Sequence, residues 1–263
     1  AIAFIDGYAN VSANSDGSKA SRWICIITFA SHANRQLNWV NVATNEGKAR
    51  ALALLDGKEW NGEIPGPNGG TNIEGGLQLA YNNLNNFKNT TGKELCDNTN
   101  VILLTDGCPT FVIDGKKTSL TALQGKEAGG NEAEMKAWMN VGGSIYTKYD
   151  DDGNPATGAK KYDSTSKNPI ADSIKAKANL FTIAFATSSS KFEYKEDSWA
   201  QLNPHYWMKS FATRALMAGD EEELLKEFET INTIIKLSAQ AWIVNDPMAS
   251  HIMMDTKTID PTN

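Results

Sequence analysis

The stretch GGTNIEGGLQLAYNNLNNFKNTTGKELCDNTNVILLTDG, residues 69–107, decides the fold that the sequence predicts. After a Gly-rich loop, apolar residues recur at spacings of three and four, which indicates an amphipathic helix. Its apolar face contains Leu77, Ala80, Tyr81, Leu84 and Phe87, and Asn82, Asn83, Asn85 and Asn86 are expected to face water. Residues 101–104 form an uninterrupted apolar run, typical of a strand covered on both faces of a parallel sheet. Asp106 follows directly, and open α/β sheets bind ligands at the carboxyl ends of their strands.

Composition sets the limits for the rest of the chain. The protein has 263 residues, enough for one large or two small domains, and 41% of them are hydrophobic. A net charge of −6 and scattered basic residues argue against a nucleic-acid partner. No apolar run reaches membrane-spanning length. The sequence shows no signal peptide and begins with Ala1, so we expect a processed protein or an excised fragment.

The three cysteines, Cys25, Cys96 and Cys108, show neither CxxC spacing nor an even count. They therefore signal neither a zinc site nor a disulfide framework. Cys96 and Cys108 flank one predicted strand, which holds them farther apart than the ~7 Å limit for Cα atoms joined by a disulfide. We expect three free thiols, with Cys25 as a small core residue.

Other segments complete an alternation of strands and helices. Residues 22–30 and 37–43 are predicted to form a β-hairpin, followed by a helix capped by Thr44 or Asn45. A helix at residues 169–178 precedes a buried strand at 180–186. A last helix is predicted to start at Asp220, with Glu223 completing a capping box. This alternation predicts an α/β fold.

Residues 110–168 have a looser pattern and are expected to form a peripheral arm. Within the arm, residues 144–150 and 158–163 are predicted to pair as a β-hairpin around DDDGNP. A calcium-binding loop is the alternative for this acidic cluster. It fits poorly, because Lys148 falls at the first ligand position and Ala159 falls where the bidentate Glu belongs.

The order of RWICIITFASHA, GGTNIEGGLQLAYNNL, VILLTDGCPT, LFTIAFAT and DEEELLKEFETI resembles a von Willebrand factor type A domain. It is most similar to those in cell-wall-anchored adhesins and pilus-tip proteins of Gram-positive bacteria, where a segment like IVNDPM marks the exit into a neighbouring domain. The resemblance implies a doubly wound, mostly parallel sheet flanked by helices. Residues 1–109 and 169–245 would form this domain, 110–168 the inserted arm, and 246–263 the exit segment.

In that family, three loops hold a divalent cation in a metal-ion-dependent adhesion site on top of the sheet. By resemblance, Thr71 matches the threonine of the second loop and Asp106 the aspartate of the third. A hydroxyl and a carboxylate are hard oxygen ligands that suit Mg²⁺, with Ca²⁺ or Mn²⁺ as alternatives. Two structural interpretations stay open: Thr71 only caps the following helix, or Asp106 only satisfies turn amides.

The DxSxS motif of the family's first loop does not occur in the sequence. Asp16 and Ser18 have the right spacing, but Ala20 replaces the second serine and the segment precedes a strand. The DSTSK segment at Asp163 also departs from the motif. The resemblance therefore implies that the central strand belongs to the same molecule but lies outside this sequence, or comes from a separate polypeptide.

The favoured function is an adhesion module without enzymatic activity, located outside the cell on the cell surface or cell wall. It would bind a protein on a host cell or in the extracellular matrix through its cation, and would contact neighbouring domains or pilus subunits. The alternative is an intracellular type A domain that partners an ATPase of chelatase or chaperone type. A hydrolase using Asp106 and His205 is disfavoured, since the sequence contains neither GxSxG nor HExxH.

Overall fold

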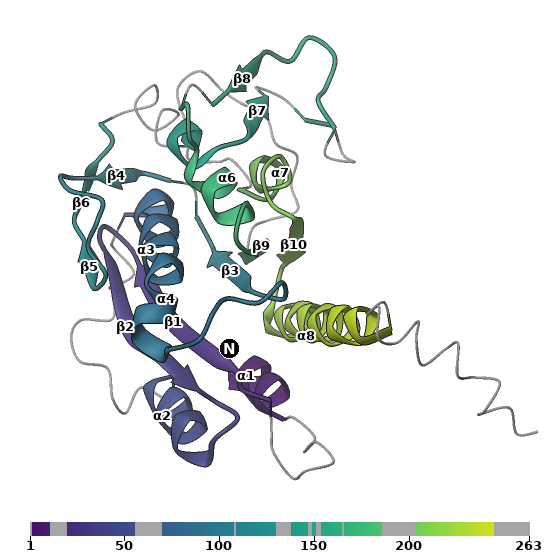
Figure 1. Cartoon of the computed structure of the whole chain (residues 1–263). Helices are drawn as coiled ribbons and strands as arrows, with labels where there is room; N and C mark the ends of the chain where they lie inside the picture. Colours follow the sequence, from purple (N-terminus) through teal and green to yellow (C-terminus); the bar gives the residue numbers. More distant parts are fainter. Residues whose placement is uncertain are drawn as a thin grey trace, which may run out of the picture.

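The computed structural model shows a mixed α/β protein in which helices cover both faces of small sheets (Figure 1). It describes residues 2–10, 20–55, 70–107, 109–129, 138–146, 149–150, 154–164, 166–185 and 204–244, with side chains described up to residue 235. Cys108 and residues 246–263 lie outside the described residues.

The first sheet contains the predicted hairpin. Strand β1 (Trp23–Phe29) pairs antiparallel with β2 (Ala33–Asn41), and β2 pairs with the short β5 (Ala122–Leu123). The register of the hairpin shifts on either side of Ile26, which marks an irregularity in β1. The hairpin is therefore confirmed, and one edge of β2 is covered by a strand from the arm.

The second sheet is parallel, in the order β10-β9-β3. It consists of β3 (Asn100–Thr105), β9 (Asn179–Phe185) and β10 (Arg214–Ala218). Strand β9 is central, and five of its seven residues are buried. The predicted strands at 101–104 and 180–186 are thus confirmed as neighbours in a parallel sheet.

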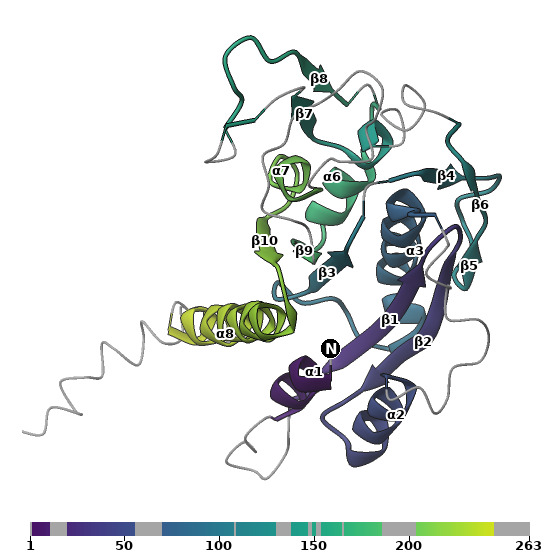
Figure 2. The ribbon, with the colours of Figure 1, turned by 180° about the vertical axis from the view of Figure 1, so that it is seen from behind.

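The strands that we expected in one sheet form two separate sheets of three strands. Among the described residues, no strand joins β1 to β3, although both strands lie on the same side of the molecule (Figure 2). The sequence pattern identified the strands but not their partners, because apolar periodicity carries no information about pairing. The structure therefore supports an α/β fold with a parallel part, and no more than that.

One layer of helices packs against β1, β2, β9 and β10. Helix α3 (Ile73–Asn85) lies on β1 and β2, and α4 (Phe87–Thr91) follows it. Helices α6 (Ile170–Lys175) and α7 (Pro204–Met208) contact β9, and α6 also contacts α3. Their apolar side chains join the largest core cluster.

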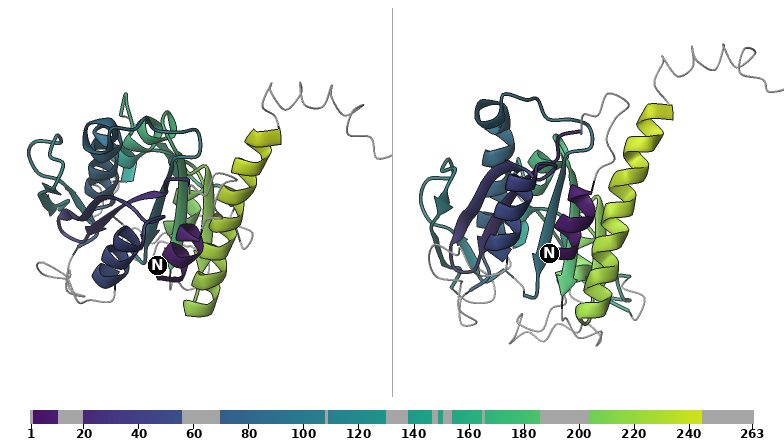
Figure 3. Two further views of the ribbon diagram at one scale, coloured as in Figure 1. Left: turned by 60° about the horizontal axis from the view of Figure 1, so that its bottom comes forward. Right: turned by 90° about the horizontal axis from the view of Figure 1, so that it is seen from below.

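The opposite layer contains α1 (Ile2–Ala9), α2 (Asn45–Leu55) and α8 (Glu221–Val244), seen clearly in Figure 3. Helix α1 packs against α2 and α8, and the Phe4 ring packs tilted against that of Phe228, with 5.5 Å between ring centroids. None of the helices in the described residues is long and apolar enough to cross a membrane.

The arm forms two small hairpins. Strand β4 (Phe111–Ile113) pairs with β6 (Gly125–Glu127), and β7 (Ser144–Tyr146) pairs with β8 (Lys161–Asp163). The predicted hairpin in this region is thus confirmed. The arm is also anchored inward, because Trp138, Val141, Ile145 and Tyr149 belong to the largest core cluster.

Two expectations about burial are wrong. Asn83 does not face water: it is 1% exposed, donates to the carbonyl oxygens of Leu79 and Leu120, and accepts from Arg35 at 2.8 Å. Strand β3 is not covered on both faces, since Leu104 is 37% exposed. The first error reflects a partner from a distant strand, and the second reflects the unpaired edge of β3.

Helix α8 begins as predicted. The Asp220 carboxylate accepts from the Glu223 N–H at 2.9 Å, and Glu223 accepts from the Gly219 N–H at 2.7 Å. Asp220→Ala should lower the free energy of unfolding by about 1 kcal/mol, because loss of the cap leaves the Glu223 N–H at the helix terminus unpaired. Urea unfolding measures this, with Glu229→Ala on the exposed part of the same helix as control. Equal losses in both variants would contradict the role of the cap.

Candidate metal centre

The candidate centre starts from the loop at residues 70–72, which is held by main-chain contacts to β1. The Asn72 N–H donates to the Ala30 carbonyl oxygen at 2.8 Å, and the Gly70 N–H donates to the Ser31 hydroxyl at 3.0 Å. Both acceptors immediately follow β1. The carboxyl end of β1 therefore reaches this loop.

Residues that follow β3 hold the same loop from the other side. The Thr71 N–H donates to the Thr110 hydroxyl at 2.9 Å. The Thr71 carbonyl oxygen accepts from the N–H groups of Thr110 and Phe111, at 3.0 and 3.2 Å. With both main-chain groups of Thr71 engaged, its position relative to residues 110 and 111 is fixed.

Thr71 lies beside the turn that carries Asp106. A Cβ atom placed on Gly107 would lie 3.0 Å from the Thr71 hydroxyl oxygen. The turn is itself fixed, because the buried Thr105 hydroxyl donates to the Gly107 carbonyl oxygen at 3.0 Å and accepts from the Gly107 N–H at 3.3 Å. Asp106 is exposed between these two residues. The structure thus brings the Thr71 hydroxyl next to the Asp106–Gly107 turn.

The structural alternative for Thr71 is wrong. Asn72 caps α3, since its side-chain oxygen accepts from the Gly75 N–H at 2.8 Å. Within the described part of the chain, the Thr71 hydroxyl forms no hydrogen bond, so its oxygen is available to a ligand. Of the turn amides, that of Gly107 goes to Thr105 rather than to Asp106.

These groups fit a hard divalent cation in type, but they fill only part of its coordination shell. A threonine hydroxyl and an aspartate carboxylate are oxygen ligands that Mg²⁺ accepts, and Mg²⁺ usually keeps several waters. The described residues contain no group of three or more His, Cys, Asp or Glu side chains that could hold a metal. Thr71 and Asp106 would therefore hold a cation together with water or with ligands from elsewhere.

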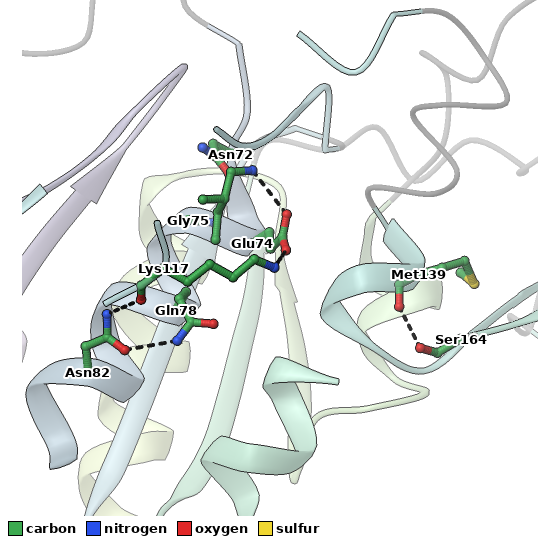
Figure 4. Close-up of polar contacts among 9 residues, drawn as sticks. Asn72, Glu74, Gly75, Gln78, Asn82, Lys117, Met139 and Ser164 are labelled. Carbon is green, nitrogen blue, oxygen red and sulfur yellow. Dashed lines mark hydrogen bonds and ion pairs between the residues drawn. The ribbon is translucent and has the colours of Figure 1, made fainter. Parts of the chain in front are cut away.

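A buried acidic residue next to the centre escaped sequence analysis. Glu74, in the first turn of α3, is 3% exposed and points toward Lys117 of the arm (Figure 4). Its carboxylate pairs with Lys117 at 2.5 Å and accepts from the Ile113 N–H at 3.1 Å. The partners come from residues about 40 positions later, so no local pattern could reveal them. Glu74 fastens α3 to the arm.

Lys117→Gln should lower the free energy of unfolding by about 1–3 kcal/mol, because it leaves the buried Glu74 carboxylate without its cation. Half of the lysine side chain is exposed, which keeps the effect below that of a fully buried pair. Urea unfolding measures the change, and the exposed neighbour Lys116 provides the control Lys116→Gln. If both variants unfold alike, the pair does not stabilise the fold.

The other polar residues considered from the sequence lie elsewhere. His205 is half-buried in α7, with its Nδ1 atom 3.2 Å from the Leu216 carbonyl oxygen, and burial lowers its pKa. Cys25 and Cys96 are free thiols. Burial raises the pKa of the Cys25 thiol to about 12. No described contact links any of these groups to Thr71 or Asp106.

Comparison with protein-family models and with curated proteins gives no match.

Proposed function

We propose that this protein is an adhesion module of the von Willebrand factor A type, which holds a divalent cation, Mg²⁺ in the first place, at Thr71 and Asp106. The observation that carries the proposal is that the Thr71 hydroxyl lies beside the Asp106–Gly107 turn, where a Cβ atom placed on Gly107 would come within 3.0 Å of it. The fold supports it, because the loop that carries Thr71 is bonded to the residues after β1, and the turn that carries Asp106 follows β3 of the parallel sheet.

The chain's own residues would supply two oxygen ligands of the cation and leave the rest of its coordination shell to water or to other ligands. Asp106 supplies a negative charge at an exposed position, where a cation can reach it from solvent. Thr71 supplies a neutral oxygen on a residue whose main chain is held by three hydrogen bonds, and two further hydrogen bonds between Thr105 and Gly107 fix the turn beside it. A fixed loop costs little ordering entropy on binding.

When bound, the cation would supply an open coordination position that a carboxylate of the partner protein could occupy. No bond of a ligand is broken in such a contact, so the proposed module is a binder and not an enzyme. Two protein oxygens leave most of an octahedral shell to water, and we therefore expect weak Mg²⁺ binding by residues 1–263 alone.

The test is adhesion to a surface coated with collagen and fibronectin, a stand-in for matrix protein ligands. Binding is measured in Mg²⁺, after addition of EDTA, and after restoring excess Mg²⁺. The proposal predicts loss with EDTA and recovery with Mg²⁺. Adhesion that is indifferent to EDTA would refute a cation-dependent contact, while leaving the fold unaffected.

A further inference from the structure

Thr110, the first residue of the arm, is joined to Thr71 by two hydrogen bonds of opposite direction. The Thr71 N–H donates to the Thr110 hydroxyl at 2.9 Å, and the Thr110 N–H donates to the Thr71 carbonyl oxygen at 3.0 Å. Any residue except proline can form the second bond, whereas the first requires a side-chain oxygen at position 110. Thr110 therefore makes a contact with the candidate centre that depends on its hydroxyl.

The two neighbours of Thr71 are bonded to a different part of the molecule. The N–H groups of Gly70 and Asn72 donate to the two residues that follow β1. Within the described residues, the main-chain groups of Thr71 itself bond only to Thr110 and Phe111. The arm is thus the element that holds the middle residue of this loop.

Thr110 is itself held on both sides. The indole N–H of Trp138, which is 2% exposed, donates to the Pro109 carbonyl oxygen at 3.1 Å. The Ala128 N–H, directly after β6, donates to the Thr110 carbonyl oxygen at 2.9 Å. Pro109 also restricts the φ angle of the main chain just before Thr110. The Thr110 hydroxyl is therefore carried by a main chain that the arm fixes.

Phe111 supports the loop at a second point. A Cβ atom placed on Gly70 would lie 1.9 Å from a carbon of the Phe111 ring, so this ring packs directly against Gly70. The ring keeps the loop from moving toward the arm, and the bonds of the loop to the residues after β1 keep it from moving away. Little displacement of Thr71 is possible while these contacts hold.

The segment after β3 would thus serve both oxygen ligands of the proposed cation. Asp106 would bind the cation directly, and Thr110, four residues later, would fix the residue that carries the other oxygen. Groups that orient a metal ligand without touching the metal strongly affect metal affinity, typically by about 10- to 100-fold.

We propose that Thr110 is a positioning residue of the cation site, and that through its hydroxyl the arm regulates the affinity for the cation. The arm holds Thr71 beside the Asp106–Gly107 turn, so opening of the arm and binding of the cation oppose each other. This inference rests on the proposed function and adds the element that controls the site. By linkage, a bound cation must in turn stabilise the contact between Thr71 and the arm.

The test titrates the ¹⁵N-labelled protein with Mg²⁺ and takes the Kd from the shift of the Gly107 amide signal. Thr110→Val keeps the shape of the side chain without its hydroxyl, and we expect it to bind Mg²⁺ about 10-fold more weakly. Thr110→Ser keeps the hydroxyl and should bind nearly as the parent does. Thr118→Val is the matched control, because Thr118 is an exposed threonine of the same arm.

Amide hydrogen exchange of the same samples gives a second readout. Thr110→Val should speed exchange of the Thr71 amide by up to about 10-fold, the factor that corresponds to one lost hydrogen bond. In the parent, saturating Mg²⁺ should slow exchange at Thr71 and Phe111 by a similar factor of about 10, because the coupling is reciprocal. This last measurement needs no variant.

The outcomes separate this inference from the proposed function. No Mg²⁺ binding by the parent, or binding that Asp106→Ala leaves unchanged, would overturn both. Binding that Asp106→Ala weakens and Thr110→Val does not would overturn the inference alone, as would equal losses in Thr110→Val and Thr110→Ser or in Thr110→Val and Thr118→Val. If Thr110→Val fails to fold, the parent decides: slower exchange at Thr71 and Phe111 in Mg²⁺ supports the inference, and unchanged exchange overturns it.

Discussion

Asp106→Ala is expected to weaken Mg²⁺ binding by at least about 10- to 100-fold. Loss of a residue that only orients a metal ligand already lowers metal affinity by that factor. Asp106 would bind the cation directly through its carboxylate. Isothermal titration with Mg²⁺ measures the effect. Asp97→Ala provides the control, because Asp97 is an exposed aspartate in the turn before β3, at the other end of the strand.

The same titration separates a ligand from a mere neighbour at position 71. Thr71→Ser keeps the hydroxyl and should bind Mg²⁺ nearly as the parent does, whereas Thr71→Val keeps the shape and removes the oxygen. We expect Thr71→Val to bind more weakly, with an unchanged urea midpoint. If the serine and valine variants bind Mg²⁺ with equal affinity, Thr71 is not a ligand. If the Asp106 and Asp97 variants do so, Asp106 is not a ligand.

Trp207→Ala should destabilise the protein by about 3–5 kcal/mol, the range for deleting a buried aromatic side chain. Trp207 is 1% exposed, and its ring centroid lies 4.8 Å from that of Trp138. Its Nε1–H donates to the Gly142 carbonyl oxygen at 3.1 Å, which ties α7 to the arm. Urea unfolding measures the loss, and Trp207→Phe should lose less, because it keeps most of the packing.

Limited proteolysis of the same variants tests the arm. We predict that the first cuts in the parent fall within residues 115–168, because that segment contains exposed polar turns, such as residues 115–118, between its buried anchors. Trp207→Ala should speed those cuts further, since it removes an anchor of the arm. First cleavage within β3 would contradict the assignment of residues 115–168 to a peripheral arm that opens more easily than the sheet.

Local signals in the sequence were sufficient for several elements. The apolar runs of β1, β3 and β9, and the Asp220 and Glu223 cap of α8, were predicted from neighbouring residues alone. These features form because apolar periodicity and capping act over a few residues. Their positions did not depend on the rest of the fold.

Features set by distant partners were not predictable in this way. The buried Asn83 accepts a hydrogen bond from Arg35, 48 positions earlier, and the buried Glu74 pairs with Lys117, 43 positions later. The capping role of Asn72 rather than Thr71 also became clear only in the structure. Thr71 and Asp106 were chosen through a resemblance, and the structure adds that the Thr71 hydroxyl lies beside Gly107, the residue after Asp106.

The most direct measurement of the central claim is an NMR titration of the ¹⁵N-labelled protein with Mn²⁺, which broadens signals close to its binding site. The account predicts that the amide signals of Thr71, Asn72 and Gly107 broaden first and that excess Mg²⁺ restores them. Broadening that starts instead at the acidic first turn of α8, or that Asp106→Ala leaves unchanged, would contradict a cation site at Thr71 and Asp106.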